Sequence, residues 1–152
     1  MAKNTSNTKY RQWDVDALSD DRYQDEEAAV DASASGPNER DIDGLLKANR
    51  TDEALRAALS NPPRRKADKA TKESAVRLVQ RVLTSFKAAD VEKAVEGLGA
   101  EELDTLVKYV YKCFELQSDN GAVPQLLHWH DQTFKRAGHG SIVRAFVDTR
   151  FL

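Results

Sequence analysis

The chain has 152 residues, of which 40% are hydrophobic and 32% are charged, and its formal net charge at pH 7 is −2. This length suffices for one ordinary domain with its own core. No run of about eighteen apolar residues occurs and no signal-peptide stretch begins the chain, which argues against a membrane span and secretion. The single cysteine, Cys113, excludes an intramolecular disulfide, so we expect a reducing, cytoplasmic compartment.

The N-terminal part of the chain differs in charge from the remainder. Residues 1–43 carry eleven acidic and five basic side chains, whereas residues 44–152 carry fourteen acidic and eighteen basic ones. Few aliphatic residues are available to build a core there, yet large apolar side chains suited to anchoring an interface recur at Tyr10, Trp13, Val15, Leu18 and Tyr23. We therefore predict an extended acidic partner-binding tail and linker over residues 1–40 and a helical domain over residues 41–152.

Two short helices are expected at the start of this domain. Ile42, Leu45 and Leu46 have helical spacing, and Asn49 tolerates the left-handed backbone that ends a helix. Thr51 is suited to cap the second helix. Two consecutive prolines in Asn61-Pro62-Pro63 remove backbone donors and should end it.

The strongest periodic pattern predicts a third helix, because six apolar residues follow the i, i+3, i+4, i+7, i+8, i+11 series of one helix face. They are Ala75, Leu78, Val79, Val82, Leu83 and Phe86. Asp90 is suited to cap a short fourth helix that Gly97 and Gly99 limit. A fifth helix follows, with a predicted apolar face of Leu103, Leu106, Val107, Val110 and Phe114.

Two further helices are predicted after the break at Ser118-Asp119-Asn120-Gly121. Pro124 favours a helix start, and the expected apolar face is Leu126, Leu127, His130 and Phe134. Gly138-His139-Gly140 should end this helix, and Ser141 is suited to cap the last one. No alternating run of strand length occurs, so we predict an all-α fold of about seven helices, either a compact bundle or an α-α superhelix.

No residue pattern is typical of an enzyme or a metal centre. His128 and His130 stand two residues apart, about 200° around a helix, whereas helical metal pairs usually stand at i and i+4. This spacing disfavours a metal-assisted hydrolase, and His130 is better interpreted as a packed, hydrogen-bonded residue. Cys113 lies within a predicted helix beside no evident base. We predict no catalytic, cofactor-binding or metal-binding residues.

A basic stretch over residues 64–81 offers a second functional interpretation. Its basic residues, which are of the type that contacts nucleic-acid phosphates, are Arg64, Arg65, Lys66, Lys69, Lys72, Arg77 and Arg81. Asp68 and Glu73 precede Lys72 and Arg77 by four residues, the favoured order for ion pairs along a helix. We prefer a solvated helix face, with a basic all-α nucleic-acid-binding module as the alternative function.

Several separate blocks, in the same order, resemble subunit 5, the smallest subunit of the actin-related protein 2/3 complex. Among these blocks are Arg11-Gln12-Trp13-Asp14-Val15-Asp16, Tyr23-Gln24-Asp25-Glu26-Glu27, Ala57-Ala58-Leu59-Ser60-Asn61-Pro62-Pro63, Val107-Lys108-Tyr109-Val110-Tyr111-Lys112 and Leu126-Leu127-His128-Trp129-His130. The sequence departs from the family pattern at Cys113, where the family usually has glycine, and at its Phe151-Leu152 end.

The resemblance implies an α-α superhelix and a non-catalytic structural subunit of the complex that nucleates branched actin filaments. It implies that the helical body docks on scaffold subunits 1 and 4 and that the tail tethers actin-related protein 2. Contacts with that protein would come from Arg11, Trp13, Asp14, Val15, Asp16 and Tyr23. The expected location is the cytoplasmic actin cytoskeleton of the cell cortex and projections, with neither nucleic acid nor a membrane span involved.

A docked body should also expose an apolar patch larger than a monomer usually tolerates. We expect Tyr109, Tyr111 and Trp129 to belong to this patch.

Overall fold

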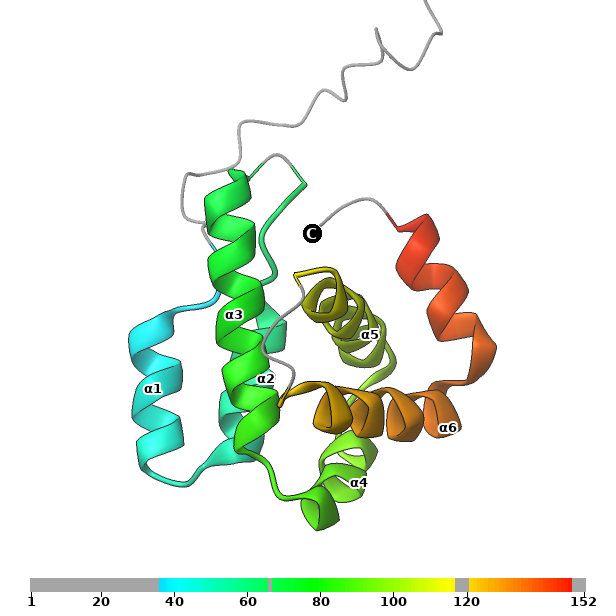
Figure 1. Ribbon diagram of the computed structural model, residues 1–152, viewed down its shortest axis with the longest axis horizontal. Helices are drawn as coiled ribbons and strands as arrows, with labels where there is room; N and C mark the ends of the chain where they lie inside the picture. Colours follow the sequence, from blue (N-terminus) through cyan, green and yellow to red (C-terminus); the bar gives the residue numbers. More distant parts are fainter. Residues whose placement is uncertain (1–35, 66, 117–120, 149–152) are drawn as a thin grey trace, which may run out of the picture. The chain divides into compact units, whose positions relative to one another are not determined.

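The computed structural model describes residues 36–65, 67–116 and 121–148, and over these ranges the protein is helical without a β-strand. The chain divides into the units Met1–Asp31 and Ala32–Leu152, and every described residue belongs to the second unit. Its helices are α1 (Glu39–Lys47), α2 (Thr51–Ser60), α3 (Lys69–Ser85), α4 (Ala88–Glu96), α5 (Ala100–Glu115) and α6 (Val123–Val147) (Figure 1). The predicted all-α fold is confirmed.

The helix ends follow the predicted breakers more closely than the predicted caps. Asn49 has a φ of 56°, and the amide of Arg50 donates to the Leu45 carbonyl at 2.9 Å, which closes α1 as expected. The chain enters α2 directly from this turn, so Arg50 rather than Thr51 is the N-cap residue. Similarly, α4 begins at Ala88, which places Asp90 inside its first turn instead of at its cap.

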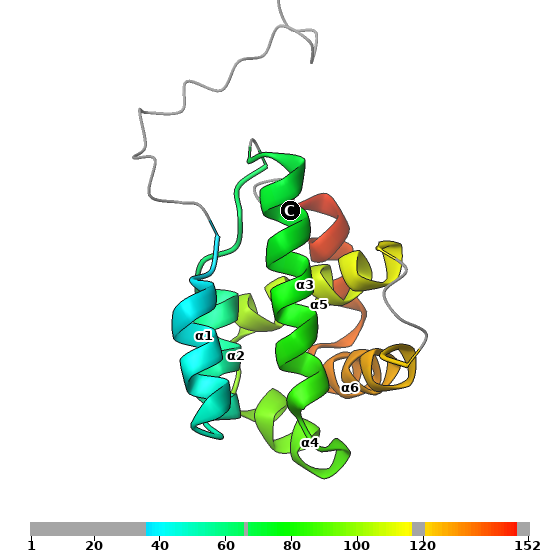
Figure 2. The same ribbon diagram turned by 60° about the vertical axis from the view of Figure 1, so that its left-hand side comes forward.

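Helix α5 is the centre of the body. It packs against α2, α3 and α6, and Figures 1 and 2 show it surrounded by these neighbours. Residues on several sides of α5 are buried, including Thr105, Lys108, Tyr109 and Val110. A helix buried on more than one side must therefore find internal partners for its polar side chains.

The apolar face of α3 agrees with its prediction, whereas the face of α6 agrees only in part. All six periodic residues from Ala75 to Phe86 are buried. In α6 the buried residues of the first half are Leu126, Trp129 and Thr133, while Leu127 is 54% exposed. Of the predicted face, Leu126 is buried and His130 and Phe134 are half-buried, but Leu127 was wrong because the helix is turned so that Trp129 enters the core.

A hydrogen-bond network explains this orientation of α6. The indole nitrogen of Trp129 donates to the carbonyl of Leu83 at 3.0 Å, and the ring meets Phe86 edge-on with centroids 5.1 Å apart. The Gln125 amide nitrogen donates to the Leu83 and Phe86 carbonyls at 3.0 and 2.5 Å. Carbonyls near a helix C-terminus lack intrahelical donors, so α6 satisfies the end of α3.

Tyr109 is the exception to this pattern of satisfied polar groups. Its side chain has no exposed surface, and its hydroxyl has no hydrogen-bond partner in the described part of the chain. Burial, together with the nearby Cys113 thiol, raises the pKa of the Tyr109 hydroxyl above its usual value. The tyrosine thus carries an unsatisfied buried donor.

We expect Tyr109→Phe to raise the free energy of unfolding of the full chain by about 1 kcal/mol, because the buried hydroxyl carries a desolvation cost without a compensating bond. The matched control is Tyr111→Phe, which removes a 3.1 Å hydrogen bond to His130 and should lower that free energy by about 0.5–1.5 kcal/mol. Urea unfolding of both variants measures the two effects. A marked loss of stability in Tyr109→Phe would show that its hydroxyl has a partner.

Candidate interaction surface

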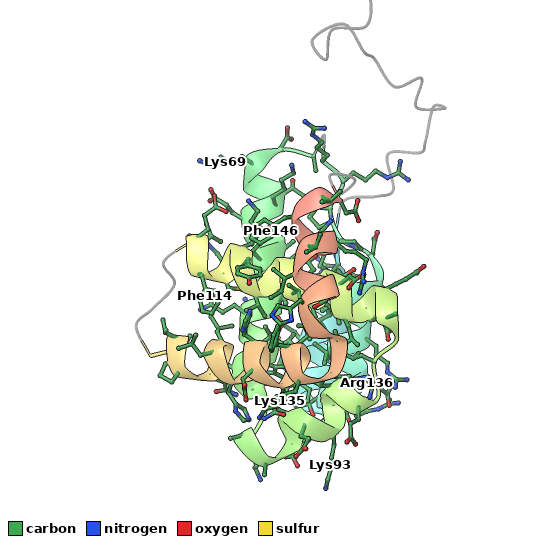
Figure 3. The ribbon with its side chains drawn as sticks, turned by 90° about the vertical axis from the view of Figure 1, so that its right-hand side faces the viewer. Lys69, Lys93, Phe114, Lys135, Arg136 and Phe146 are labelled. Atoms are coloured by element: carbon green, nitrogen blue, oxygen red, sulfur yellow. The ribbon has the colours of Figure 1, made fainter. Side chains whose placement is uncertain are left out.

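The C-terminal part of α6 forms a separate half-helix, residues 139–147, because the helix is broken at Gly138. That residue has a φ of 67° and a ψ of −172°, in a region that favours glycine. Ser141 donates its hydroxyl to the Gly138 carbonyl at 2.8 Å across the break. Figure 3 shows the half-helix turning sharply away from the first half of α6, and the two halves correspond to the predicted sixth and seventh helices.

The half-helix has an inner and an outer face. Ser141 is buried, and Ile142 and Ala145 are half-buried beside it. The outer face consists of Val143, Phe146 and Val147, which are 59%, 69% and 73% exposed. These three side chains stand at i, i+3 and i+4, so they share one side of the helix and form an apolar stripe, which we call the outer stripe.

A half-buried aromatic cluster lies beside the outer stripe. The ring of Tyr111 is 5.2 Å from that of Phe146 and 5.5 Å from that of His130. Phe134 stacks on His130 at 6.4 Å and meets His139 edge-on at 4.8 Å. Phe146 leans from the half-helix toward α5 in Figure 3. The predicted hydrogen bond of His130 is confirmed, since its Nε2 lies 3.1 Å from the Tyr111 hydroxyl.

Two ion pairs attach the end of α6 to α5, and we call them the charge clamp. Arg144 holds Asp104 through two hydrogen bonds, Nε to Oδ2 at 2.6 Å and Nη2 to Oδ1 at 2.9 Å. The ammonium of Lys108 lies 3.1 Å from the Asp148 carboxylate and donates to the Asp148 carbonyl at 2.7 Å. The hydrogen bond and charge of Asp104 raise the pKa of Arg144.

The charge clamp has a reciprocal arrangement. Asp104 and Lys108 stand four residues apart on α5, and Arg144 and Asp148 stand four residues apart at the end of α6. Each helix thus contributes one acid and one base on the same side. The Lys108 side chain is only 6% exposed, which makes its pairing with Asp148 necessary on energetic grounds.

The basic stretch does not form a continuous row of unpaired charges. Arg81 pairs with Asp43 at 2.9 Å and with Glu39 at 3.3 Å, both on α1. Glu73 lies 3.8 Å from Lys69, rather than forming the predicted pair with Arg77. Lys72 donates to the Arg65 carbonyl at 2.5 Å, and Lys66 lies outside the described residues. Acidic neighbours therefore interrupt the proposed phosphate track.

Cys113 is packed in the core. Its sulfur lies 3.9 Å from the Val76 carbonyl oxygen, and the residue is 1% exposed. Burial raises the pKa of this thiol from 9.0 to about 12. In the described ranges no group of three or more His, Cys, Asp and Glu side chains is placed to hold a metal ion. Likewise, none of the described helices is long and apolar enough to cross a membrane.

We expect the folded chain to react very slowly with a disulfide reagent such as Ellman's reagent. A rise of the Cys113 pKa from 9.0 to about 12 lowers the thiolate fraction at pH 8 roughly a thousandfold. Reaction in urea should be fast. Since the folded pKa is raised, the stability contributed by the neutral thiol is present below pH 9 and lost between pH 9 and about 12. Equal reaction rates with and without urea would contradict the burial.

The residues predicted to bind partners lie partly outside the described residues and partly in the core. The tail residues Arg11, Trp13, Asp14, Val15, Asp16 and Tyr23 lie outside the described residues. Tyr109 and Trp129 were expected in an exposed patch, and this was wrong, because both side chains are fully buried. Tyr111 is half-buried in the aromatic cluster.

Sequence reasoning missed the outer stripe and the charge clamp. The last predicted helix has apolar residues on more than one side, and the sequence does not show which side has a neighbour. The two ion pairs join residues 40 positions apart, beyond any local pairing rule.

Comparison with known proteins identifies the family. Residues 9–152 match the family described as the ARP2/3 complex 16 kDa subunit, p16-Arc. The chain belongs to this family.

Three relatives are similar to this chain over nearly the full length of both proteins. Actin-related protein 2/3 complex subunit 5-C of Xenopus laevis is 42% identical over 147 residues, which covers 97% of each chain. The subunit 5-like protein of Homo sapiens is 39% identical over 149 residues, again 97% of each chain. A probable subunit 5 of Caenorhabditis elegans is 37% identical and covers 96% of this chain and 99% of its own length. The resemblance found from the sequence is thus confirmed.

Proposed function

We propose that this p16-Arc family protein is a non-catalytic structural subunit of the ARP2/3 complex and acts in the nucleation of branched actin filaments. The observation that carries the proposal is the family match over residues 9–152, together with relatives named as subunits of that complex. The proposed location is the cytoplasmic actin cytoskeleton, at the cell cortex and in projections.

The helical body would attach the protein to scaffold subunits 1 and 4. Support comes from the exposed outer stripe and from Leu127, which are the exposed large hydrophobic side chains of the described body. Apolar side chains gathered on one surface are typical of a protein that buries this surface against a partner. Docking of the body would not involve a catalysed reaction.

The N-terminal tail would tether actin-related protein 2. The sequence over residues 1–40 supplies aromatic anchors at Trp13 and Tyr23 within an acidic segment. A tether on a docked body raises the local concentration of the second partner, so weak tail contacts still hold it in the complex. The proposed contacts are Arg11, Trp13, Asp14, Val15, Asp16 and Tyr23.

Nucleic-acid binding is the weaker function. A phosphate-binding face requires basic groups available to the ligand. Instead, Arg81 is held by the Asp43 and Glu39 carboxylates, and Glu73 lies against Lys69. The described basic residues are therefore partly neutralised within the protein.

We expect affinity isolation from cells to separate the two attachments. The tagged full chain should recover actin-related protein 2 and the scaffold subunits together. A variant lacking residues 1–35 should recover the scaffold subunits at a similar level but lose most of actin-related protein 2, because the tether is removed while the body from Gly36 onward remains. Quantitative mass spectrometry of the isolated proteins measures both.

The matched control is Trp13→Ala with Tyr23→Ala in the full chain, which keeps the tail length but removes its two aromatic anchors. Its recovery of actin-related protein 2 should be as low as that of the truncated chain. Undiminished recovery of actin-related protein 2 with the truncated chain would refute the tethering role.

A further inference from the structure

We propose that α1 is a release segment, which opens from the body ahead of the other helices and thereby lengthens the tether. The inference rests on the proposed function, because the tail N-terminal to α1 is taken as that tether. Helix α1, Glu39–Lys47, is the first described helix, so a pull on the tail reaches the body through it. Opening of α1 is a property of the purified chain and can be measured there.

Little apolar burial attaches α1 to the body. Ile42, which is 1% exposed, is the one buried residue of α1, and Leu45 and Leu46 are only half-buried. Figures 1 and 2 show α1 at the edge of the body, where it packs against α2 and α3. Its nine residues are too few to stay helical in water without such contacts. Detachment of α1 therefore removes one side chain from the core and leaves α5 with its neighbours α2, α3 and α6.

The N-terminal end of α1 borders an open cleft of about 590 Å³. The cleft is lined by Asn38 and Ile42 on one side and by Ala57 and Asn61 on the other. The Asn61 amide nitrogen donates to the Gly36 carbonyl at 3.1 Å at this end of the helix. Atoms that face open space lose packing partners on that side. The packing of α1 on α2 is therefore incomplete at the end where a pull from the tail would act.

Gly44 weakens α1 although the surrounding structure does not require a glycine. The residue lies in the interior of the helix and is exposed, and a Cβ added there would meet no atom within 4 Å. A glycine in a helix interior lowers the population of the helix about two- to fivefold relative to alanine. Helix α1 is therefore less stable than its length and its contacts would allow.

Ion pairs that are exposed to solvent also attach α1. Arg81 of α3 lies 2.9 Å from the Asp43 carboxylate and 3.3 Å from the Glu39 carboxylate, and these two acids stand one turn apart on α1. The side chains of Arg81, Asp43 and Glu39 are 51%, 36% and 64% exposed, so dissolved salt screens their attraction. The attachment of α1 thus depends on ionic strength.

Release of α1 would lengthen the tether by a defined amount. A helical residue advances the chain by about 1.5 Å, and an extended residue advances it by up to about 3.3–3.6 Å. The nine residues of α1 therefore add roughly 15–20 Å when they open under load. A longer tether keeps hold of a partner that moves away from the body, because binding requires that the linker span the two sites.

The first experiment measures amide hydrogen exchange in the purified full-length chain. We expect the amides of α1 to exchange at least about tenfold faster than those of α3 and α5, because α1 opens without them. Gly44→Ala should slow exchange in α1 about two- to fivefold, since it removes the cost of the glycine. Exchange in α5 should be the same in both chains, which distinguishes opening of α1 from a change in the whole fold.

Arg81→Gln tests the ion pairs in the same measurement. It should speed exchange in α1 about two- to fivefold, and it should remove the acceleration that added salt produces in the wild type. The matched control is Arg77→Gln, one turn earlier on α3, because Arg77 is exposed and forms no ion pair with any residue of α1. Exchange in α1 should be unchanged by this control.

The second experiment measures the lengthening by pulling on single molecules. The force is applied between an N-terminal tag and a cysteine introduced by Lys93→Cys, because Lys93 is exposed on α4 and points away from the body in Figure 3. Buried Cys113 does not compete for the attachment. We expect a first extension step of roughly 15–20 Å before the body unfolds. Gly44→Ala should raise the force of this step, and Arg81→Gln should lower it.

The possible outcomes distinguish this inference from the proposed function. If the wild-type chain recovers no complex subunit in affinity isolation, the proposed function fails, and with it the tether that α1 would lengthen. If α1 exchanges as slowly as α3 and α5, or if α1 unfolds in one step with the body, the release segment is refuted while the function stands. Equal exchange in the wild type and Arg81→Gln at low and high salt would refute the role of the ion pairs.

Discussion

The burial of α5 is the constraint on which the remaining structure depends. A helix that is apolar on one side can rest on a single neighbour, but α5 buries side chains on several sides, from Thr105 to Tyr109 and Val110. Its neighbours α2, α3 and α6 must therefore cover it from different directions. This requirement makes one central helix, rather than a sheet or a symmetric helix pair, the organising element of the body.

Burial of α5 also determines where the end of the chain's last helix lies. Lys108 is on the buried part of α5, and an ammonium group there requires a nearby carboxylate and further acceptors. Asp148 supplies both a carboxylate and a carbonyl oxygen. Placing Asp148 over Lys108 requires α6 to turn, and Gly138 provides the turn at a backbone conformation that other residues rarely adopt. The break in α6 thus makes it possible for Asp148 to pair with the buried Lys108.

The sequence predicts those elements whose information is local. The third helix could be placed because its six apolar residues meet neighbours along a single face, and the end of α1 could be placed because Asn49 tolerates a positive φ. The face of α6 could not, since its first half has apolar residues at both Leu126 and Leu127 and periodicity alone does not choose between them. Trp129 decides the choice by reaching the Leu83 carbonyl, 46 positions earlier in the chain.

The same reasoning explains why the exposed patch was wrongly predicted at Tyr109 and Trp129, although the protein family was predicted correctly. Large aromatic residues such as Tyr109 and Trp129 suit an interface by composition, but each is equally suited to a core. The side chains left outside are Val143, Phe146 and Val147, which are all more than half exposed although the Phe146 ring also contacts Tyr111 of α5. The pairs Arg144–Asp104 and Asp148–Lys108 hold the end of α6 against α5, and the second pair also stabilises the buried lysine. The ion pair of the buried lysine thus lies beside the exposed apolar side chains at the end of α6.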